Sequence, residues 1–226
     1  MAGLWMFHRE LLRGGLSATG VDAALMGVLG GLAGAKIVWA IEFRHDAPFL
    51  SLLLSRGGLS WFGGLLGGVG AGLLSLRRRR IPIVPALAAA APSLAIGHAI
   101  GRIGCFLVGD DYGRPTDLPW GVAFPRGLPP VTVPVHPTQL YETVGLAVIA
   151  WLLIKWRRGR IADAVVFGRY LVLAGVLRFL IEFIRVNKPI AGPLTLAQLF
   201  SAAIMFVGLW FIQTRPYENP SRRGHR

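Results

Sequence analysis

Three charged residues stand at helical spacing inside a long apolar segment of the chain. Arg178, Glu182 and Arg185 follow one another at i, i+4 and i+7, so a helix would place them on one face. A charged side chain at the centre of a lipid-exposed span costs roughly 2.5 to 3.5 kcal/mol, so this face should point into the protein or a wet cavity. The simpler alternative is that Arg178 and Glu182 only neutralise each other.

Other cations lie in or beside apolar segments. Lys36 lies within the first such segment, and Arg102 follows the third. If Arg178 pairs with Glu182, then Lys36, Arg102 and Arg185 are expected to stay unpaired. Excess positive charge near a membrane surface favours an anion, and the arginine fork can hold two phosphate oxygens. The predicted ligand is a phospholipid phosphate.

A polar segment between the third and fourth apolar blocks supplies further candidates. It contains four glycines that are expected to permit tight turns and a close approach of backbone to ligand: Gly101, Gly104, Gly109 and Gly113. Its acids Asp110, Asp111 and Asp117 are interpreted as solvated loop residues. Next to this segment, Glu142 opens the fourth apolar block.

We expect neither a metal nor a cofactor. The conceivable metal ligands are His98, Cys105, Asp110 and His136, but no pair of them has the spacing typical of metal ligands. Cys105 is the single cysteine, which excludes an internal disulfide.

The composition is that of a membrane protein. The chain has 226 residues, of which 54% are hydrophobic and 15% charged, and its apolar residues fall in long blocks. Its net charge of +13 could suggest a nucleic-acid partner, but Lys and Arg cluster in short segments between the blocks, as in cytoplasmic membrane loops. Nucleic acid is therefore not a predicted partner.

The predicted fold is all-α: one polytopic membrane bundle over residues 1–226, with about six transmembrane helices. A hydrocarbon core of roughly 30 Å needs about 20 apolar residues in a helix. The expected spans are Val21–Phe43, Leu59–Leu76, Ile81–Ile100, Gln139–Trp156, Ala164–Ile184 and Leu194–Ile212.

The basic segments predict the orientation of these spans. The N-terminal arm, Arg77–Arg80, Lys155–Arg160 and the C-terminal tail all fall on one side, which the positive-inside rule places in the cytoplasm. The loop at residues 101–138 is then outside, and we expect it to form a small extracytoplasmic cap. The N-terminus lacks the pattern of a cleaved signal peptide.

The first two predicted spans are rich in glycine at four-residue spacing. This pattern is typical of close helix packing. Gly63 and Gly64 could also let a lipid headgroup approach the backbone, so they are candidate substrate-binding residues.

Four segments of the chain resemble the prolipoprotein diacylglyceryl transferase family. They are GGLSWFGGLLGG (57–68), GRIGCFLVGDDYGRPTDLPWGVAFP (101–125), HPTQLYE (136–142), and LRFLIEFIR with AQLFS (177–185 and 197–201). The resemblance implies transfer of the diacylglyceryl group of phosphatidylglycerol to the lipobox cysteine of a preprolipoprotein. It also implies the bacterial inner membrane, with the active site toward the periplasm.

By position in these motifs, the resemblance implies that Arg102 and Arg178 are essential arginines. Gly113 closes the signature, Glu182 and Arg185 match the same helix as Arg178, and Lys36 falls where many members have arginine.

The chain also departs from the family pattern. Phe62 replaces a histidine, Cys105 an asparagine and Ala174 a tyrosine, and six spans are expected where the family has seven.

The expected mechanism places the lipid phosphate between Arg102 and Arg178, which neutralise the leaving glycerol phosphate. The base that deprotonates the thiol is predicted to be His136, ahead of His98 and Glu142. Two alternatives stay open: a phospholipid-binding relative without catalysis, and a small transporter that uses its intramembrane charges as a relay.

Overall fold

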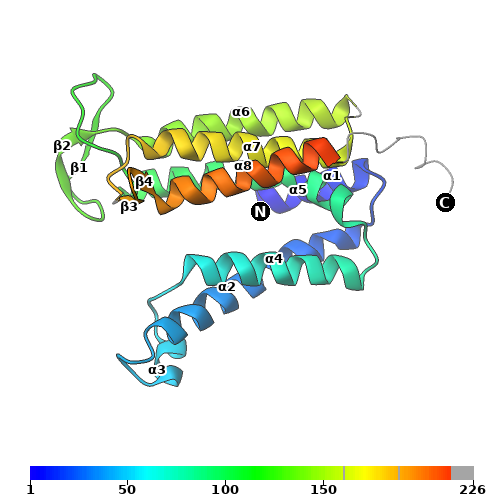
Figure 1. Cartoon of the computed structure of the whole chain (residues 1–226), viewed down its shortest axis with the longest axis horizontal. Helices are drawn as coiled ribbons and strands as arrows, with labels where there is room; N and C mark the ends of the chain where they lie inside the picture. Colours follow the sequence, from blue (N-terminus) through cyan, green and yellow to red (C-terminus); the bar gives the residue numbers. More distant parts are fainter. Residues whose placement is uncertain (160, 188, 215–226) are drawn as a thin grey trace. The chain divides into compact units, whose positions relative to one another are not determined.

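The computed structural model describes residues 1–159, 161–187 and 189–214 (Figure 1). These residues form two compact units. One comprises Phe7–Ala86, and the other comprises Met1–Met6 with the chain from Leu87 onward. The expected single membrane domain stays a prediction.

The Phe7–Ala86 unit is built around two long helices, α2 (Val21–Glu42) and α4 (Trp61–Arg78). The short helices η1 (Ala18–Gly20) and α3 (Phe49–Leu54) precede and follow α2, and most of α1 (Ala2–Arg13) also belongs here. Helices α2 and α4 lie side by side (Figure 1) and touch through glycines. A Cβ added at Gly63 would collide with the Gly34 carbonyl, and one at Gly67 with the Gly30 carbonyl. Glycine therefore permits this close backbone approach.

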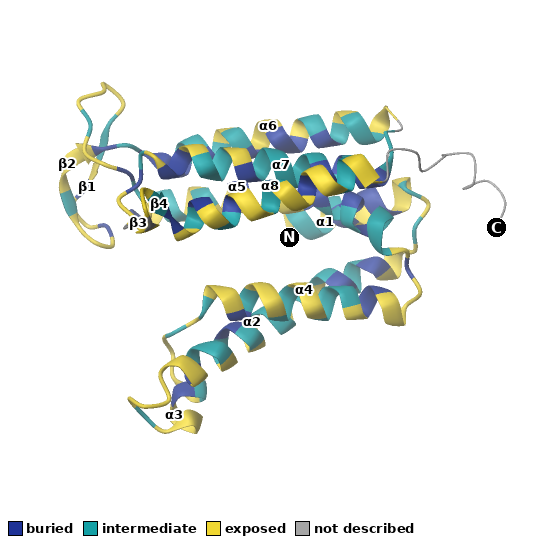
Figure 2. Ribbon diagram, viewed as in Figure 1, coloured by how far each residue is buried: buried dark blue, intermediate teal, exposed yellow. Residues whose placement is uncertain are grey.

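The second unit is a bundle of four long helices: α5 (Ile83–Val108, shared at its start with the other unit), α6 (Thr138–Arg158), α7 (Asp163–Glu182) and α8 (Leu196–Thr214). Its core joins small residues of α5 to larger apolar residues of α6 and α7. Figure 2 shows buried residues at intervals along the bundle helices. Ala88, Ala91 and Ala95 pack in one buried cluster with Leu153 and Val166. Helices α7 and α8 approach closely where Gly168 faces the backbone of Gly208.

Two small antiparallel hairpins accompany the bundle. Strand β1 (Val122–Phe124) pairs with β2 (Val131–Val135), and β3 (Pro189–Ala191) pairs with β4 (Leu194–Thr195). Both lie toward the end of the bundle where α7 ends (Figure 1). The expected all-α fold is thus mostly helical, with these hairpins added to it.

Among the described residues, four helical segments are long and apolar enough to cross a membrane: Ala18–Glu42, Ile83–Val108, Asp163–Glu182 and Leu196–Thr214. The second and fourth predicted spans correspond to α4 and α6, which are helices but do not reach this apolarity. Helix α4 is glycine-rich and ends in two arginines, and α6 has a polar start and a basic end. The count of six spans therefore stays a prediction.

The predicted boundary between the third span and the cap was wrong by about two helical turns. Helix α5 continues to Val108, so Gly101 and Gly104 lie within a helix and not in turns. Arg102 consequently has a helical position. Arg160, Lys188 and the C-terminal tail from Arg215, all parts of predicted loops or basic segments, lie outside the described residues.

Candidate active site

The bundle unit brings three arginines and three carboxylates into one connected cluster. Its members come from α5 (Arg102), the segment after α5 (Asp111), α6 (Glu142), α7 (Arg178 and Glu182) and the turn after α7 (Arg185). We call these six residues the arginine–carboxylate cluster. Five were candidates from the sequence, and Asp111 was not.

Glu142 joins two arginines from different helices. Its Oε2 lies 2.5 Å from Arg102 Nε, and its Oε1 lies 3.8 Å from Arg178 Nη1. The Glu142 side chain is only 2% exposed, so its charge needs these cations as partners. Glu142 therefore brings the guanidinium groups of α5 and α7 toward one point.

Glu182 anchors the other side of Arg178. Its Oε2 lies 2.8 Å from Arg178 Nη2, and its Oε1 accepts hydrogen bonds of 2.7 Å from Asn187 Nδ2 and from Thr195 Oγ1. The predicted i, i+4 pair exists, but it is part of a larger network. Among the described residues, Arg178 Nη1 is buried and makes no hydrogen bond, and it faces Glu142 Oε1 at 3.8 Å.

Asp111 bridges the two remaining arginines. Its Oδ2 lies 2.7 Å from Arg102 Nη1, and its Oδ1 lies 2.5 Å from Arg185 Nη2. Its carbonyl oxygen accepts hydrogen bonds from Arg185 Nη1 at 3.1 Å and from Thr138 Oγ1 at 2.8 Å. Partial burial alone would raise the pKa of Asp111, but the hydrogen bonds and charges of Arg185 and Arg102 outweigh it and hold this pKa below its usual value.

The expectation that Arg102 and Arg185 are unpaired cations was wrong. Both contact carboxylates, and the six charges sum to zero, three positive against three negative. The physical reason is desolvation, because a buried ion is stable only with a counter-ion beside it. Asp111, interpreted from the sequence as a solvated loop acid, is that counter-ion for two arginines.

Gly113 joins the segment between α5 and α6 (residues 109–137) to the ends of the helices. Its N–H donates to the His136 carbonyl at 2.9 Å, and it forms an antiparallel bridge with Arg185. A Cβ at this position would lie 2.6 Å from the Ile184 carbonyl oxygen and 2.8 Å from Thr138 Cγ2. Gly113 therefore has a packing role here, and its assignment to substrate binding stays a prediction.

His136 lies in a chain of polar aromatic contacts. Trp120 Nε1 donates to Tyr141 Oη at 2.7 Å, and Tyr141 Oη lies 3.4 Å from His136 Nδ1. Among the described residues, the His136 ring forms no hydrogen bond or ion pair with a charged group of the cluster. Its role as the base stays a prediction, and Tyr141 and Trp120 are neighbours that the sequence did not single out.

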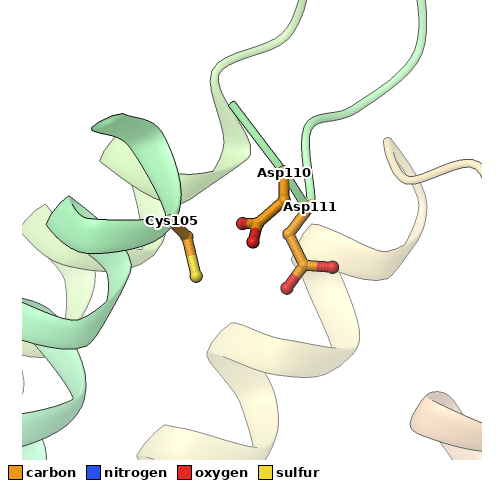
Figure 3. A group of neighbouring side chains, drawn as sticks. All are labelled: Cys105, Asp110 and Asp111. Carbon is orange, nitrogen blue, oxygen red and sulfur yellow. The ribbon is translucent and has the colours of Figure 1, made fainter. Parts of the chain in front are cut away.

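Two of the four conceivable metal ligands come together with a third residue. Cys105, Asp110 and Asp111 offer ligand atoms within 4.8 Å of one another (Figure 3). Arg102 Nη1 lies 3.9 Å from Cys105 Sγ and 2.7 Å from Asp111 Oδ2. The Arg102 guanidinium is therefore already the cation beside these ligand atoms. This arrangement does not favour a metal ion.

Lys36, Gly63 and Gly64 belong to the other unit. Lys36 Nζ donates to Ser55 O and Oγ at 2.9 Å and lies 4.6 Å from the centre of a Trp39 ring. The lysine therefore holds the loop that precedes α4. Gly63 packs against α2, whereas Gly64 has only ordinary contacts, so headgroup binding at either glycine stays a prediction.

The family model and the similar proteins that match this chain belong to one family. The family model described as prolipoprotein diacylglyceryl transferase matches residues 1–214. A phosphatidylglycerol--prolipoprotein diacylglyceryl transferase of Geobacter sulfurreducens is 36% identical over 222 residues, which cover 92% of this chain and 84% of that protein. A protein of the same name from Shewanella oneidensis is 31% identical over 226 residues, covering 94% of this chain and 82% of its own length.

Proposed function

Because the chain belongs to the prolipoprotein diacylglyceryl transferase family, we propose that it transfers the diacylglyceryl group of phosphatidylglycerol to a prolipoprotein at the arginine–carboxylate cluster. In this proposal the lipid phosphate binds at Arg102 and Arg178. The acceptor is the thiol of the lipobox cysteine. The protein acts in the inner membrane through six spans, with this cluster on the periplasmic side.

The observation that carries the proposal is the convergence of two arginines from α5 and α7 on Glu142. Buried carboxylates hold both guanidinium groups in place before a ligand arrives. Preorganised donors that meet charge as it develops are a major source of catalysis, since they need no rearrangement during the reaction. We therefore assign Glu142 and Glu182 to positioning the arginines.

The chemical step is a substitution at the glyceryl carbon. The sulfur of the acceptor forms a bond to this carbon as the bond from carbon to phosphate oxygen breaks, and glycerol phosphate leaves with the electron pair. In this proposal Arg178 Nη1, a buried donor that makes no hydrogen bond among the described residues, donates to the leaving oxygen. We propose that His136, in contact with Tyr141, receives the thiol proton.

The test is thioether formation on a lipobox peptide by the purified protein in phosphatidylglycerol nanodiscs. Arg102→Ala and Arg178→Ala should each lower the rate by about a hundredfold or more, because each removes a donor to the leaving group. Arg126→Ala is the control, since Arg126 is an exposed arginine of the segment between α5 and α6, outside the cluster. Full activity in both cluster variants would refute the proposal, and lipid binding without turnover in the wild type would favour a non-catalytic phospholipid-binding protein.

A further inference from the structure

The arginine–carboxylate cluster is already neutral, which makes the binding of an additional anion unfavourable. Arg102, Arg178 and Arg185 are balanced by Asp111, Glu142 and Glu182 before any ligand is present. A phosphodiester that joined these six groups unchanged would leave an excess negative charge in a poorly solvated site, which is unfavourable. Binding is easier if one carboxylate leaves its arginines as the phosphate arrives.

The three carboxylates differ in how easily they could leave. The side chains of Glu142 and Glu182 are 2% and 0% exposed, so neither has water to replace its arginine. Glu182 also accepts hydrogen bonds from Asn187 and Thr195. The Asp111 side chain is 43% exposed, so water can solvate its carboxylate once it moves. Solvent access therefore singles out Asp111.

The donors that Asp111 occupies suit a phosphate. Its two oxygens contact the terminal nitrogens of Arg102 and Arg185, and two oxygens of a phosphodiester could bind the same pair. Its backbone has a φ of 59°, in the left-handed region that non-glycine residues seldom adopt. The residue is thus held in an uncommon conformation at the point where its side chain meets both cations.

We propose that Asp111 is an exchangeable counter-ion, whose place on Arg102 and Arg185 is taken by two oxygens of the lipid phosphate that Arg178 also contacts. The inference rests on the proposed function, because it assumes that the lipid phosphate binds at the cluster. Asp111 then sets the affinity for the lipid, since the anion must compete with a carboxylate that belongs to the protein. A fixed positioning role for Asp111 predicts the opposite effect of its removal.

The decisive variant is Asp111→Asn. Asparagine has nearly the same volume and tolerates the left-handed backbone, but it carries no charge to compete with phosphate. The apparent affinity for phosphatidylglycerol should increase about two- to fivefold, the range expected for a partly exposed ion pair. Asp111→Gly, which also removes the backbone strain, should change the affinity in the same direction.

The control is Asp117→Asn, because Asp117 is an exposed acid of the same segment between α5 and α6. Binding is measured with vesicles of phosphatidylglycerol diluted in phosphatidylcholine, and the KM for phosphatidylglycerol is measured in parallel. An affinity for phosphatidylglycerol equal to or below that of the wild type in both Asp111 variants would overturn the inference. The proposed function fails separately, if Arg102→Ala and Arg178→Ala bind this lipid and turn it over like the wild type.

Discussion

Gly113→Ala should separate the segment between α5 and α6 from the helix ends that carry the arginine–carboxylate cluster. The added methyl group would lie 2.6 Å from the Ile184 carbonyl oxygen, 2.8 Å from Thr138 Cγ2 and 2.9 Å from His136 Cβ. All three distances are too short for a carbon in van der Waals contact. The segment that carries Gly113 or the one that carries Ile184 must therefore move.

The size of the expected loss in stability depends on which atoms surround the added methyl group. Overpacking by one carbon costs typically about 1–3 kcal/mol, and less where a flexible side chain can turn away. Here the nearest neighbour is a backbone carbonyl, and the Arg114 N–H holds it by a hydrogen bond of 2.8 Å. We expect a loss in the upper half of that range. Because Arg185 follows Ile184 directly, its contact with Asp111 should be lost as well.

The control for this variant is Gly101→Ala, since an added Cβ at Gly101 meets nothing within 4 Å. Gly101 lies in helix α5 beside Arg102, and alanine is favoured over glycine in a helix by about 1 kcal/mol. Thermal unfolding in nanodiscs and thioether formation are measured for both variants. Gly113→Ala should unfold at a lower temperature than the wild type and lose most activity, whereas Gly101→Ala should unfold at or above the wild-type temperature and keep its activity. Equal behaviour of the two variants would show that the contacts at Gly113 are not those described.

Two further predictions concern the cluster and the α2–α4 contact. Glu142→Gln should destabilise the protein by about 3–5 kcal/mol and abolish thioether formation, because it leaves two arginines without their shared buried carboxylate. Thermal unfolding measures the loss of stability, and the transfer assay measures the loss of activity. Activity near that of the wild type would contradict a positioning role for Glu142. Gly63→Ala should lower the unfolding temperature by an amount that corresponds to about 1–3 kcal/mol, because its methyl would lie 2.7 Å from Val38 Cβ and collide with the Gly34 carbonyl. Gly70→Ala, in the same helix with nothing within 4 Å of its Cβ, should unfold like the wild type, and equal shifts in the two glycine variants would count against this packing.

The helices could be predicted from the sequence because the length of an apolar block is a local property. The predicted segments Val21–Phe43 and Ala164–Ile184 match α2 and α7 to within two residues at each end. The end of α5 could not be predicted, because Gly101 and Gly104 indicate a turn by their type alone. In the structure the helix continues through both glycines to Val108. Tertiary contacts override the weak local preference of glycine.

The cluster could be predicted only where its contacts are local. Arg178 and Glu182 are four residues apart, and the helical period brings them together. Asp111 and Arg185 are 74 residues apart, so no spacing rule joins them. Asp111 was assigned to solvent because acids in glycine-rich loops are usually solvated, and its positive φ is visible only in three dimensions.

The pairing of Asp111 changes the reason for which the cluster should bind a phosphate. From the sequence, affinity would come from cations without partners, but buried cations require counter-ions, and these six groups are neutral together. Affinity for phosphate must then come from the arrangement of the arginine donors and from the replacement of Asp111 by the phosphate. Two fixed carboxylates orient the arginines, and a third, with 43% of its side chain exposed, can be replaced. A cluster of this kind binds an anion only when the incoming oxygens match the arginine donors better than Asp111 does, so it selects for phosphate geometry and not for negative charge alone.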